Sequence, residues 1–157
     1  MNFMTCHLIS DCSDITSTLT QKTFGIMGDI DCSSSNVIYA YQCYFCNKQY
    51  VGETSTSLRI RANGHRFTIE RKHRLSSLYT HLKVHADTTY LPDYNRSSLG
   101  DYNLIPIEQI HSSGSDCQDI INRLKRETVL ECSPGIIRTN RVKQKTFGRY
   151  IRICRKK

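Results

Sequence analysis

Two pairs of side chains in this sequence have the types and spacing of a metal site. Cys43 and Cys46 are separated by two residues, and His81 and His85 by three. Residues four apart on a helix share one face, so both imidazoles can reach a common ion. Two thiolates and two imidazoles are a common ligand set for structural, tetrahedral zinc. The 34 residues between the pairs leave open the alternative of free thiols in a turn and surface histidines.

A second set of residues has side chains suited to binding a phosphate and handling a proton. Tyr39 and Tyr50 lie in two short runs of β-branched and aromatic residues, which we expect to pair as strands. Arg61 and His65 follow on a basic stretch, one helical turn apart. An arginine offers a planar fork of donors to phosphate oxygens. Each residue also has a purely structural interpretation, as a buried strand tyrosine, a solvated arginine or a half-buried histidine.

A carboxylate further along the chain stands out by its place in the hydrophobic pattern. Residues 115–130 predict a helix whose inward stripe runs through Ile120 and Leu124 to Glu127. A carboxylate on the apolar side of a helix is costly to desolvate unless it meets a cation or a donor. Glu127 is therefore a candidate ligand for a cation, with pairing to a nearby lysine or arginine as the alternative.

The elements that must position these residues follow from hydrophobic periodicity. Gly52 is expected to end the second strand, where its missing side chain allows close approach of the backbone. Pro106 lacks a ladder donor and favours an edge position for the third strand. The pattern predicts strands over 37–43, 49–52 and 104–110, and helices over 56–72, 76–85 and 115–130. The expected fold is α+β, a small three-stranded sheet with a β-hairpin and flanking helices.

Composition sets the class of protein and its surroundings. A chain of 157 residues with 38% hydrophobic and 23% charged residues is expected to form one globular domain. Residues 1–34 show no sustained period and predict an irregular segment, apart from a short strand near residues 22–27. We expect no secretory signal and no membrane span, hence an intracellular protein with reduced thiols.

The charge of the chain is concentrated near its end. Nine of the 22 lysines and arginines lie between Arg138 and Lys157, a stretch without a single acid. Such a run attracts phosphate backbones through counterion release. We therefore expect residues 141–157 to be a basic tail, which either contacts DNA or is a solvated or localisation segment.

The ordered set of these residues resembles the GIY-YIG nuclease family. Val37-Ile38-Tyr39 and Tyr50-Val51-Gly52 stand where the family has its two tripeptides, and Arg61 and His65 stand on the helix that follows. The cysteine pair between the tripeptides looks most like the endonuclease domains of Penelope-like retroelements, which carry a similar two-Cys, two-His set. The resemblance covers roughly residues 32–140, and it delimits a nuclease-like domain over 35–140.

The resemblance implies a metal-dependent DNA endonuclease of the hydrolase class. Arg61 would hold the scissile phosphate, and Glu127 would bind a catalytic Mg²⁺ at the leaving oxygen. Tyr39, with His65 or Tyr50, would position or deprotonate the water, and the choice of base stays open. Zinc at the two cysteines and two histidines would be structural. DNA would be the partner, contacted by a basic helix and tail that include Arg59, Arg66, Lys143, Lys145 and Arg149.

The resemblance also implies a nuclear location and a reverse transcriptase domain in a longer parent polypeptide.

Two other functions stay open. After Glu127 the chain departs from the family pattern, with Ile137 where an asparagine is expected and no tryptophan in the chain. This departure favours, as the alternative, a catalytically inactive DNA-binding remnant with a structural zinc knuckle. A zinc-stabilised interaction module without a nucleic-acid role is the third interpretation.

Overall fold

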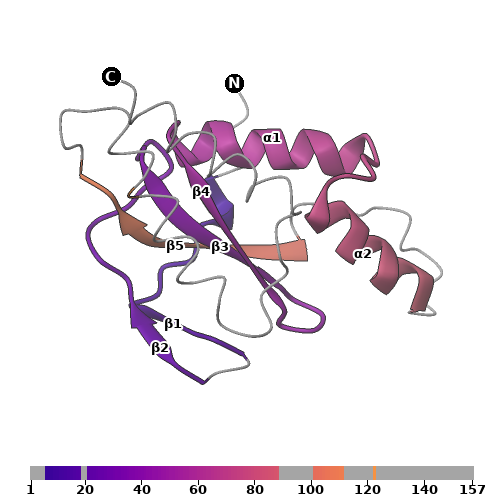
Figure 1. Cartoon of the computed structure of the whole chain (residues 1–157), viewed down its shortest axis with the longest axis horizontal. Coiled ribbons are helices and arrows are strands. Elements are labelled where there is room, and N and C mark those ends of the chain that lie inside the picture. Colours follow the sequence, from indigo (N-terminus) through magenta and orange to yellow (C-terminus); the bar gives the residue numbers. More distant parts are fainter. Residues whose placement is uncertain (1–5, 19–20, 89–100, 112–121, 123–157) are drawn as a thin grey trace, which may run out of the picture.

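The computed structural model describes residues 6–18, 21–88, 101–111 and 122. Neither of the two helices in this part of the chain is long and apolar enough to cross a membrane. The α+β class expected from the sequence is confirmed, because two helices accompany two antiparallel sheets (Figure 1). In chain order the elements are η1 (Cys6–Leu8), β1 (Asp14–Thr16), β2 (Thr23–Gly25), β3 (Val37–Cys43), β4 (Gln49–Thr54), α1 (Leu58–Glu70), α2 (Ser77–Thr88) and β5 (Tyr102–Gln109).

The central sheet has the strand order β4-β3-β5, and both neighbouring pairs are antiparallel. β3 and β4 form the expected hairpin, with Tyr39 opposite Gly52 and Tyr41 opposite Tyr50. β5 lies at an edge of this sheet, as Pro106 predicted. Pro106 stands opposite Tyr39, beside a shift of register that leaves one extra residue on β5. A missing amide hydrogen is tolerated at such an irregularity.

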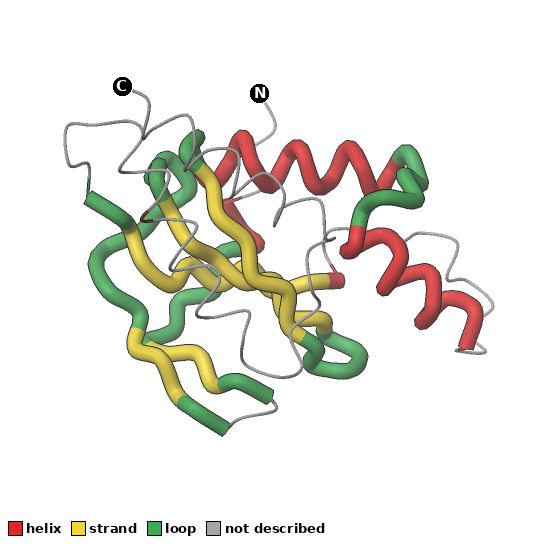
Figure 2. The backbone as a smooth tube through the Cα atoms, in the orientation of Figure 1, coloured by secondary structure: helices red, strands yellow, loops and turns green. Residues whose placement is uncertain are grey.

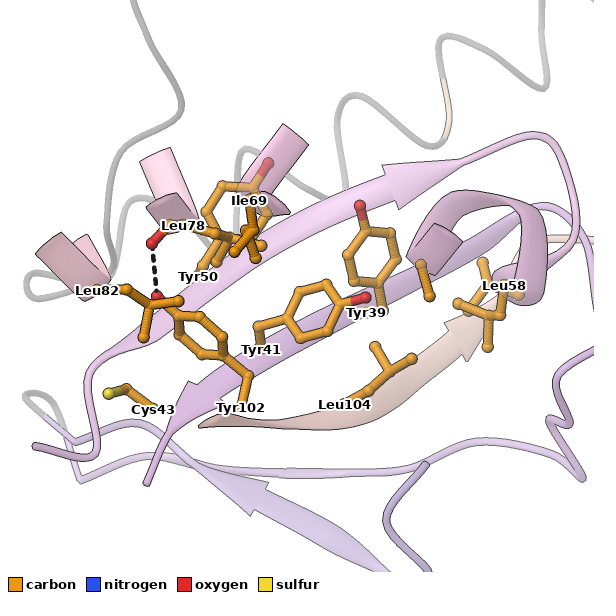
Figure 3. Close-up of a cluster of buried hydrophobic side chains, with 12 residues drawn as sticks. Tyr39, Tyr41, Cys43, Tyr50, Leu58, Ile69, Leu78, Leu82, Tyr102 and Leu104 are labelled. Carbon is orange, nitrogen blue, oxygen red and sulfur yellow. Dashed lines mark hydrogen bonds between the residues drawn. The ribbon is translucent and has the colours of Figure 1, made fainter. Parts of the chain in front are cut away.

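One face of the sheet packs against the helices. Side chains alternate across a strand, so Tyr39, Tyr41 and Cys43 of β3 all point to this face. Figure 3 shows the three in a row along β3, with Tyr102 and Leu104 of β5 beside them. The face of α1 that packs on the sheet carries a half-buried His65 and three buried residues: Leu58, Ala62 and Ile69.

The other face of the sheet is covered by the N-terminal part of the chain. β1 and β2 pair antiparallel, and Ile15 of β1 packs with Ile38, Ala40 and Ile105. Figure 1 shows this hairpin below the central sheet, with α1 above it. The predicted strand near residues 22–27 is present as β2, but the prediction of an otherwise irregular segment is wrong. A strand of three residues is too short to show a period in the sequence.

Local signals place the helices close to their predicted bounds. The side chain of Ser57 accepts a hydrogen bond from the Ile60 amide and caps α1. The side chain of Thr54, three residues before Ser57, bonds the backbone and side chain of Thr56. The helix predicted over 76–85 is α2, which runs three residues further. The helix predicted over 115–130 lies outside the described residues except for Asn122.

Candidate functional site

The first cluster of functional side chains is built around the hydroxyl of Tyr39. The Nε atom of Arg61 donates a hydrogen bond to this oxygen over 2.7 Å. The Nε2 atom of His65 lies 2.9 Å from the same oxygen. The sequence places these residues 22 and 26 positions after the tyrosine, and the packing of α1 on β3 brings them together. Three of the residues predicted to act on phosphate therefore share one hydrogen-bonded cluster.

Gly52 makes the room that this cluster needs. A Cβ atom on Gly52 would lie 2.6 Å from the Tyr39 hydroxyl oxygen and 2.7 Å from the ring carbon that bears it. Real Cβ atoms do not approach so closely, so only glycine fits opposite this ring. The prediction of close approach at Gly52 is confirmed, but the group that approaches is the Tyr39 ring. The prediction that Gly52 ends the strand is wrong, because β4 continues to Thr54.

Counting donors fixes one direction in the cluster. An arginine nitrogen can only donate, so the Tyr39 oxygen accepts from Arg61. The Tyr39 hydroxyl bonds His65 in one of two ways, by donating its proton to an unprotonated Nε2 or by accepting a second hydrogen bond from a protonated Nε2. One hydroxyl therefore joins both polar partners in either tautomer of His65.

The Tyr39 phenol stays protonated because it is buried, and Arg61 stays charged although it is partly buried. Burial raises the pKa of Tyr39 well above its ordinary value, and the nearby Arg61 charge lowers it only in part. For Arg61, burial lowers the pKa, but Tyr39, Tyr50 and the carboxylate of Glu53 outweigh this and raise the pKa overall. The cluster therefore carries a fixed, half-buried positive charge held by a neutral phenol.

Aromatic rings hold the imidazole of His65 from three sides. The ring centroids of Tyr39, Tyr41 and Tyr50 lie 6.1, 5.3 and 5.8 Å from that of His65, each in an edge-on arrangement. Such edge-to-face contacts fix ring orientation as well as burying area. Tyr50, a predicted site residue, thus contacts the cluster through its ring.

Tyr41 was not predicted as a site residue, although strand alternation puts it on the same face as Tyr39. It is completely buried, and its hydroxyl is the one buried side-chain oxygen or nitrogen in the described part of the chain without a hydrogen-bond partner. Burial raises its pKa, so the group stays a neutral phenol. Leaving such a donor unsatisfied has a free-energy cost.

The second cluster lies at the other end of β3. The thiols of Cys43 and Cys46 and the imidazole of His81 each offer one ligand atom, and these atoms all lie within 4.8 Å of one another. The Cys46 sulfur lies 3.4 Å from Nε2 of His81. Two ligands of tetrahedral zinc with bonds of about 2.3 Å to sulfur and 2.0–2.1 Å to nitrogen stand about 3.6 Å apart. The three groups can therefore hold a metal ion and are compatible with zinc.

The turn between β3 and β4 aims the two thiols. Backbone amides of Phe45 and Cys46 donate to the Cys43 sulfur, and they oppose the effect of burial, which raises the pKa of that thiol. The Asn47 amide closes the turn on the Cys43 carbonyl over 2.8 Å. Amide donors around a sulfur favour its thiolate form, which is the form that binds metals.

Tyr102 places the histidine of the second cluster. Its hydroxyl donates to the Leu78 carbonyl over 3.0 Å, joining β5 to α2 (Figure 3). Its ring also lies beside His81, with 6.3 Å between the centroids. His85, the predicted fourth ligand, follows one turn later in α2, and its side chain lies outside those that the structure describes.

The remaining predicted site residues divide into placed and unplaced ones. Arg59 is exposed near the start of α1, and Arg66 is half-buried on the same helix. Glu127, Lys143, Lys145 and Arg149 lie outside the described residues.

The expectation of reduced thiols holds in part. Cys12, Cys43 and Cys46 are not part of a disulfide. Cys32 is disulfide-bonded, so the expectation is wrong for this residue. An argument from composition and compartment treats all cysteines alike, whereas pairing depends on which of them meet in the fold.

Comparison with protein-family models, with curated proteins and with solved structures finds no match for this chain. Function must therefore be inferred from the two clusters themselves.

Proposed function

We propose that this protein is a GIY-YIG-type endonuclease that hydrolyses a DNA phosphodiester bond with the help of Mg²⁺, from a Penelope-like retroelement. The observation that carries the proposal is the Tyr39 hydroxyl, which joins Arg61 and His65 at 2.7 and 2.9 Å. A purely structural role explains each residue alone. It does not explain why one strand tyrosine gathers an arginine and a histidine from the following helix, opposite a glycine that makes room for it.

Arg61 is the residue proposed to grip the scissile phosphate. Its bond to Tyr39 uses Nε, and that bond leaves the two Nη groups of the fork to face phosphate oxygens. The guanidinium is half-buried, and charge pairs are stronger where water is partly excluded. Negative charge grows on the phosphate oxygens as the attacking oxygen bonds to phosphorus and the bond to the leaving sugar oxygen breaks. A fixed cation at this place lowers the barrier.

Tyr39 is proposed as a positioning residue rather than the base. Its side chain is completely buried and its pKa is raised by that burial, so it does not meet bulk water as a phenolate. It holds the guanidinium and the imidazole in a fixed mutual orientation. His65 can then orient a phosphate oxygen or the attacking water. A divalent ion at Glu127 would neutralise charge on the leaving oxygen and lower the pKa of a bound water.

Zinc is proposed for the second cluster, with Cys43, Cys46, His81 and His85 as its four ligands. A site filled by four protein ligands has no open position for substrate, so its role would be structural. It would fasten the β3–β4 turn to α2 at one end of the strand that carries Tyr39.

DNA would approach over the basic side of α1 and the basic tail. Arg59 and Arg66 are proposed to contact the phosphate backbone, together with Lys143, Lys145 and Arg149. Phosphate contacts position a protein without reading sequence, so we expect loose sequence preference at most. A nuclear location and a reverse transcriptase domain in a longer parent polypeptide belong to the same proposal.

The deciding experiment is nicking of supercoiled plasmid with Mg²⁺ by the zinc-loaded chain. Arg61→Ala and Glu127→Ala are expected to lower the nicking rate by about 10²-fold or more, the usual effect of removing charge stabilisation from a transition state. Arg74→Ala is the matched control, because it removes one exposed arginine just beyond α1. No cleavage by the wild type refutes the enzyme, and equal cleavage by all four proteins points to a contaminating nuclease.

A further inference from the structure

Two aromatic side chains at the tip of the β3–β4 turn are exposed to solvent. Tyr44 is 63% exposed and Phe45 is 41% exposed. They sit between the two cysteines of the second cluster, in the loop that joins the ends of β3 and β4 (Figure 2). Neighbouring exposed aromatic side chains offer a surface for contact, because burying them is favourable.

The turn holds these rings in a fixed place. The Tyr44 amide donates to the Asp101 carbonyl over 3.0 Å, and the Cys43 amide donates to the Lys48 carbonyl over 2.9 Å. Asn47 adopts a left-handed conformation with φ of 58°, which asparagine tolerates better than most residues. The cysteines on either side belong to the candidate zinc cluster. Ordering the rings on binding therefore has a low entropic cost.

The surroundings favour a nucleic acid as the occupant. From Tyr39 to Gly52 the only charged residue is Lys48, which is exposed. One acidic residue, Asp101, is bonded to the turn, and the bond uses its backbone carbonyl, which accepts from the Tyr44 amide. Flat aromatic rings beside a lysine suit the faces of bases, which every nucleotide offers when it is not stacked in a duplex.

We propose that Tyr44 and Phe45 form a stacking platform for unpaired bases, so that this protein prefers DNA with a single-stranded gap, flap or loop over fully paired duplex. The platform and the Tyr39 cluster share β3. Tyr44 follows Tyr39 by five positions, so the two residues lie roughly 17 Å apart along the chain at about 3.3 Å per residue. Successive bases stand about 3.4 Å apart, so the unpaired bases lie roughly five nucleotides from a phosphate held by Arg61. This spacing rests on the proposed nuclease function, whereas the binding preference does not.

The test measures binding without cleavage. Fluorescence anisotropy, with zinc present and no added Mg²⁺, compares the affinity of the full chain for a labelled duplex with a five-nucleotide gap and for the same duplex fully paired. The double variant Tyr44→Ser/Phe45→Ser is expected to bind the gapped DNA about tenfold more weakly or worse, since a base stacked on an aromatic ring contributes about that much. Its affinity for paired duplex is expected to change less than twofold. 2-Aminopurine in the gap reports stacking directly.

Two control variants separate the effect of stacking from effects of misfolding and of lost exposed apolar area. Tyr44→Phe/Phe45→Tyr keeps both rings and is expected to keep the preference for gapped DNA. Ile60→Ser/Phe67→Ser removes exposed apolar side chains from α1 and is expected to keep it as well. Zinc content and melting temperature are measured for each protein. Equal affinity of the wild type for both DNAs, or an equal loss for both in the serine variant, overturns the platform.

The outcomes separate this inference from the nuclease proposal. A preference for gapped DNA that depends on Tyr44 and Phe45, in a protein that never nicks, supports the platform and refutes the enzyme. Nicking that depends on Arg61, in a protein without a preference for gapped DNA, supports the enzyme and refutes the platform. If neither DNA binds detectably, both the stacking platform and the nuclease proposal are overturned.

Discussion

The two clusters around β3 differ in what their side chains can bind. In the Tyr39 cluster, the polar groups bond one another, since Arg61 donates to the phenol and the phenol also bonds His65. In the cluster of Cys43, Cys46 and His81, the three ligand atoms lie within 4.8 Å of one another and could hold a metal ion, although Cys46 and His81 also share a hydrogen bond. The two thiolates would repel each other without a cation once both thiols ionise.

The difference separates a cluster that is held together by its own hydrogen bonds from one that could hold a metal ion. The Tyr39 cluster is preorganised by the protein alone, which suits the role proposed for it at a transition state. If the cysteine and histidine cluster binds zinc as proposed, its stability is linked to metal concentration. Experiments that alter one cluster and not the other can therefore test this contrast.

Metal removal has the largest expected effect. If the cysteine and histidine cluster binds zinc as proposed, a strong chelator such as 1,10-phenanthroline is expected to cost about 5 kcal/mol or more of stability. For a chain of this size that is roughly 10–20 °C in Tm. Cys43→Ser should reproduce most of this loss and lower the zinc content, measured by elemental analysis.

Cys12→Ser is the control for that experiment, because Cys12 is also a free thiol and lies outside the cluster. It is expected to keep one zinc per chain and a Tm close to that of the wild type. An unchanged Tm in the chelated protein, or equal zinc contents for the two serine variants, would contradict a structural metal at Cys43.

Gly52→Ala tests the fit of the Tyr39 cluster at an intermediate magnitude. The added methyl meets a buried ring that hydrogen bonds hold in place, so it should cost about 1–3 kcal/mol of stability, as overpacking does. Gly64→Ala is the matched control, because a Cβ there meets nothing within 4 Å. In a helix it should stabilise the protein by about 0.5–1 kcal/mol. Urea unfolding measures both, and effects of equal sign would argue against the described contact.

Tyr41→Phe has the smallest expected effect on stability, and its sign is informative. It deletes a buried hydroxyl that has no described partner, so we expect a gain of about 1 kcal/mol. Tyr102→Phe removes a hydroxyl that bonds the Leu78 carbonyl, so we expect a loss of about 1 kcal/mol. Thermal unfolding of the two variants side by side reports the difference. A loss of similar size in both would mean that the Tyr41 hydroxyl has a partner after all.

The sequence predicted the central sheet and α1 because their signals are local. Runs of β-branched and aromatic residues predicted β3 and β4, and helical spacing predicted α1. The sequence did not predict the pairing of β1 with β2, because strands of three residues show no readable period. The same limit hid the fact that this hairpin covers the second face of the sheet.

The sequence named Tyr39, Arg61 and His65 through a resemblance, but it could not show that one hydroxyl joins them. That geometry depends on how α1 packs over β3, which involves residues more than 20 positions apart. Gly52 shows the same limit, since its purpose is visible only when the ring of Tyr39 lies against it. The unsatisfied hydroxyl of Tyr41 is a property of the packed core and has no signature in the sequence.

The most direct test of the account compares plasmid nicking by Tyr39→Phe and Tyr41→Phe. Both variants lose a single oxygen from a completely buried ring on the same face of β3. If the Tyr39 hydroxyl holds Arg61 and His65 for catalysis, Tyr39→Phe should nick about 10²-fold more slowly while keeping its zinc and its fold. Tyr41→Phe should stay within about threefold of the wild type. Equal rates for the two variants would contradict the central role given to Tyr39.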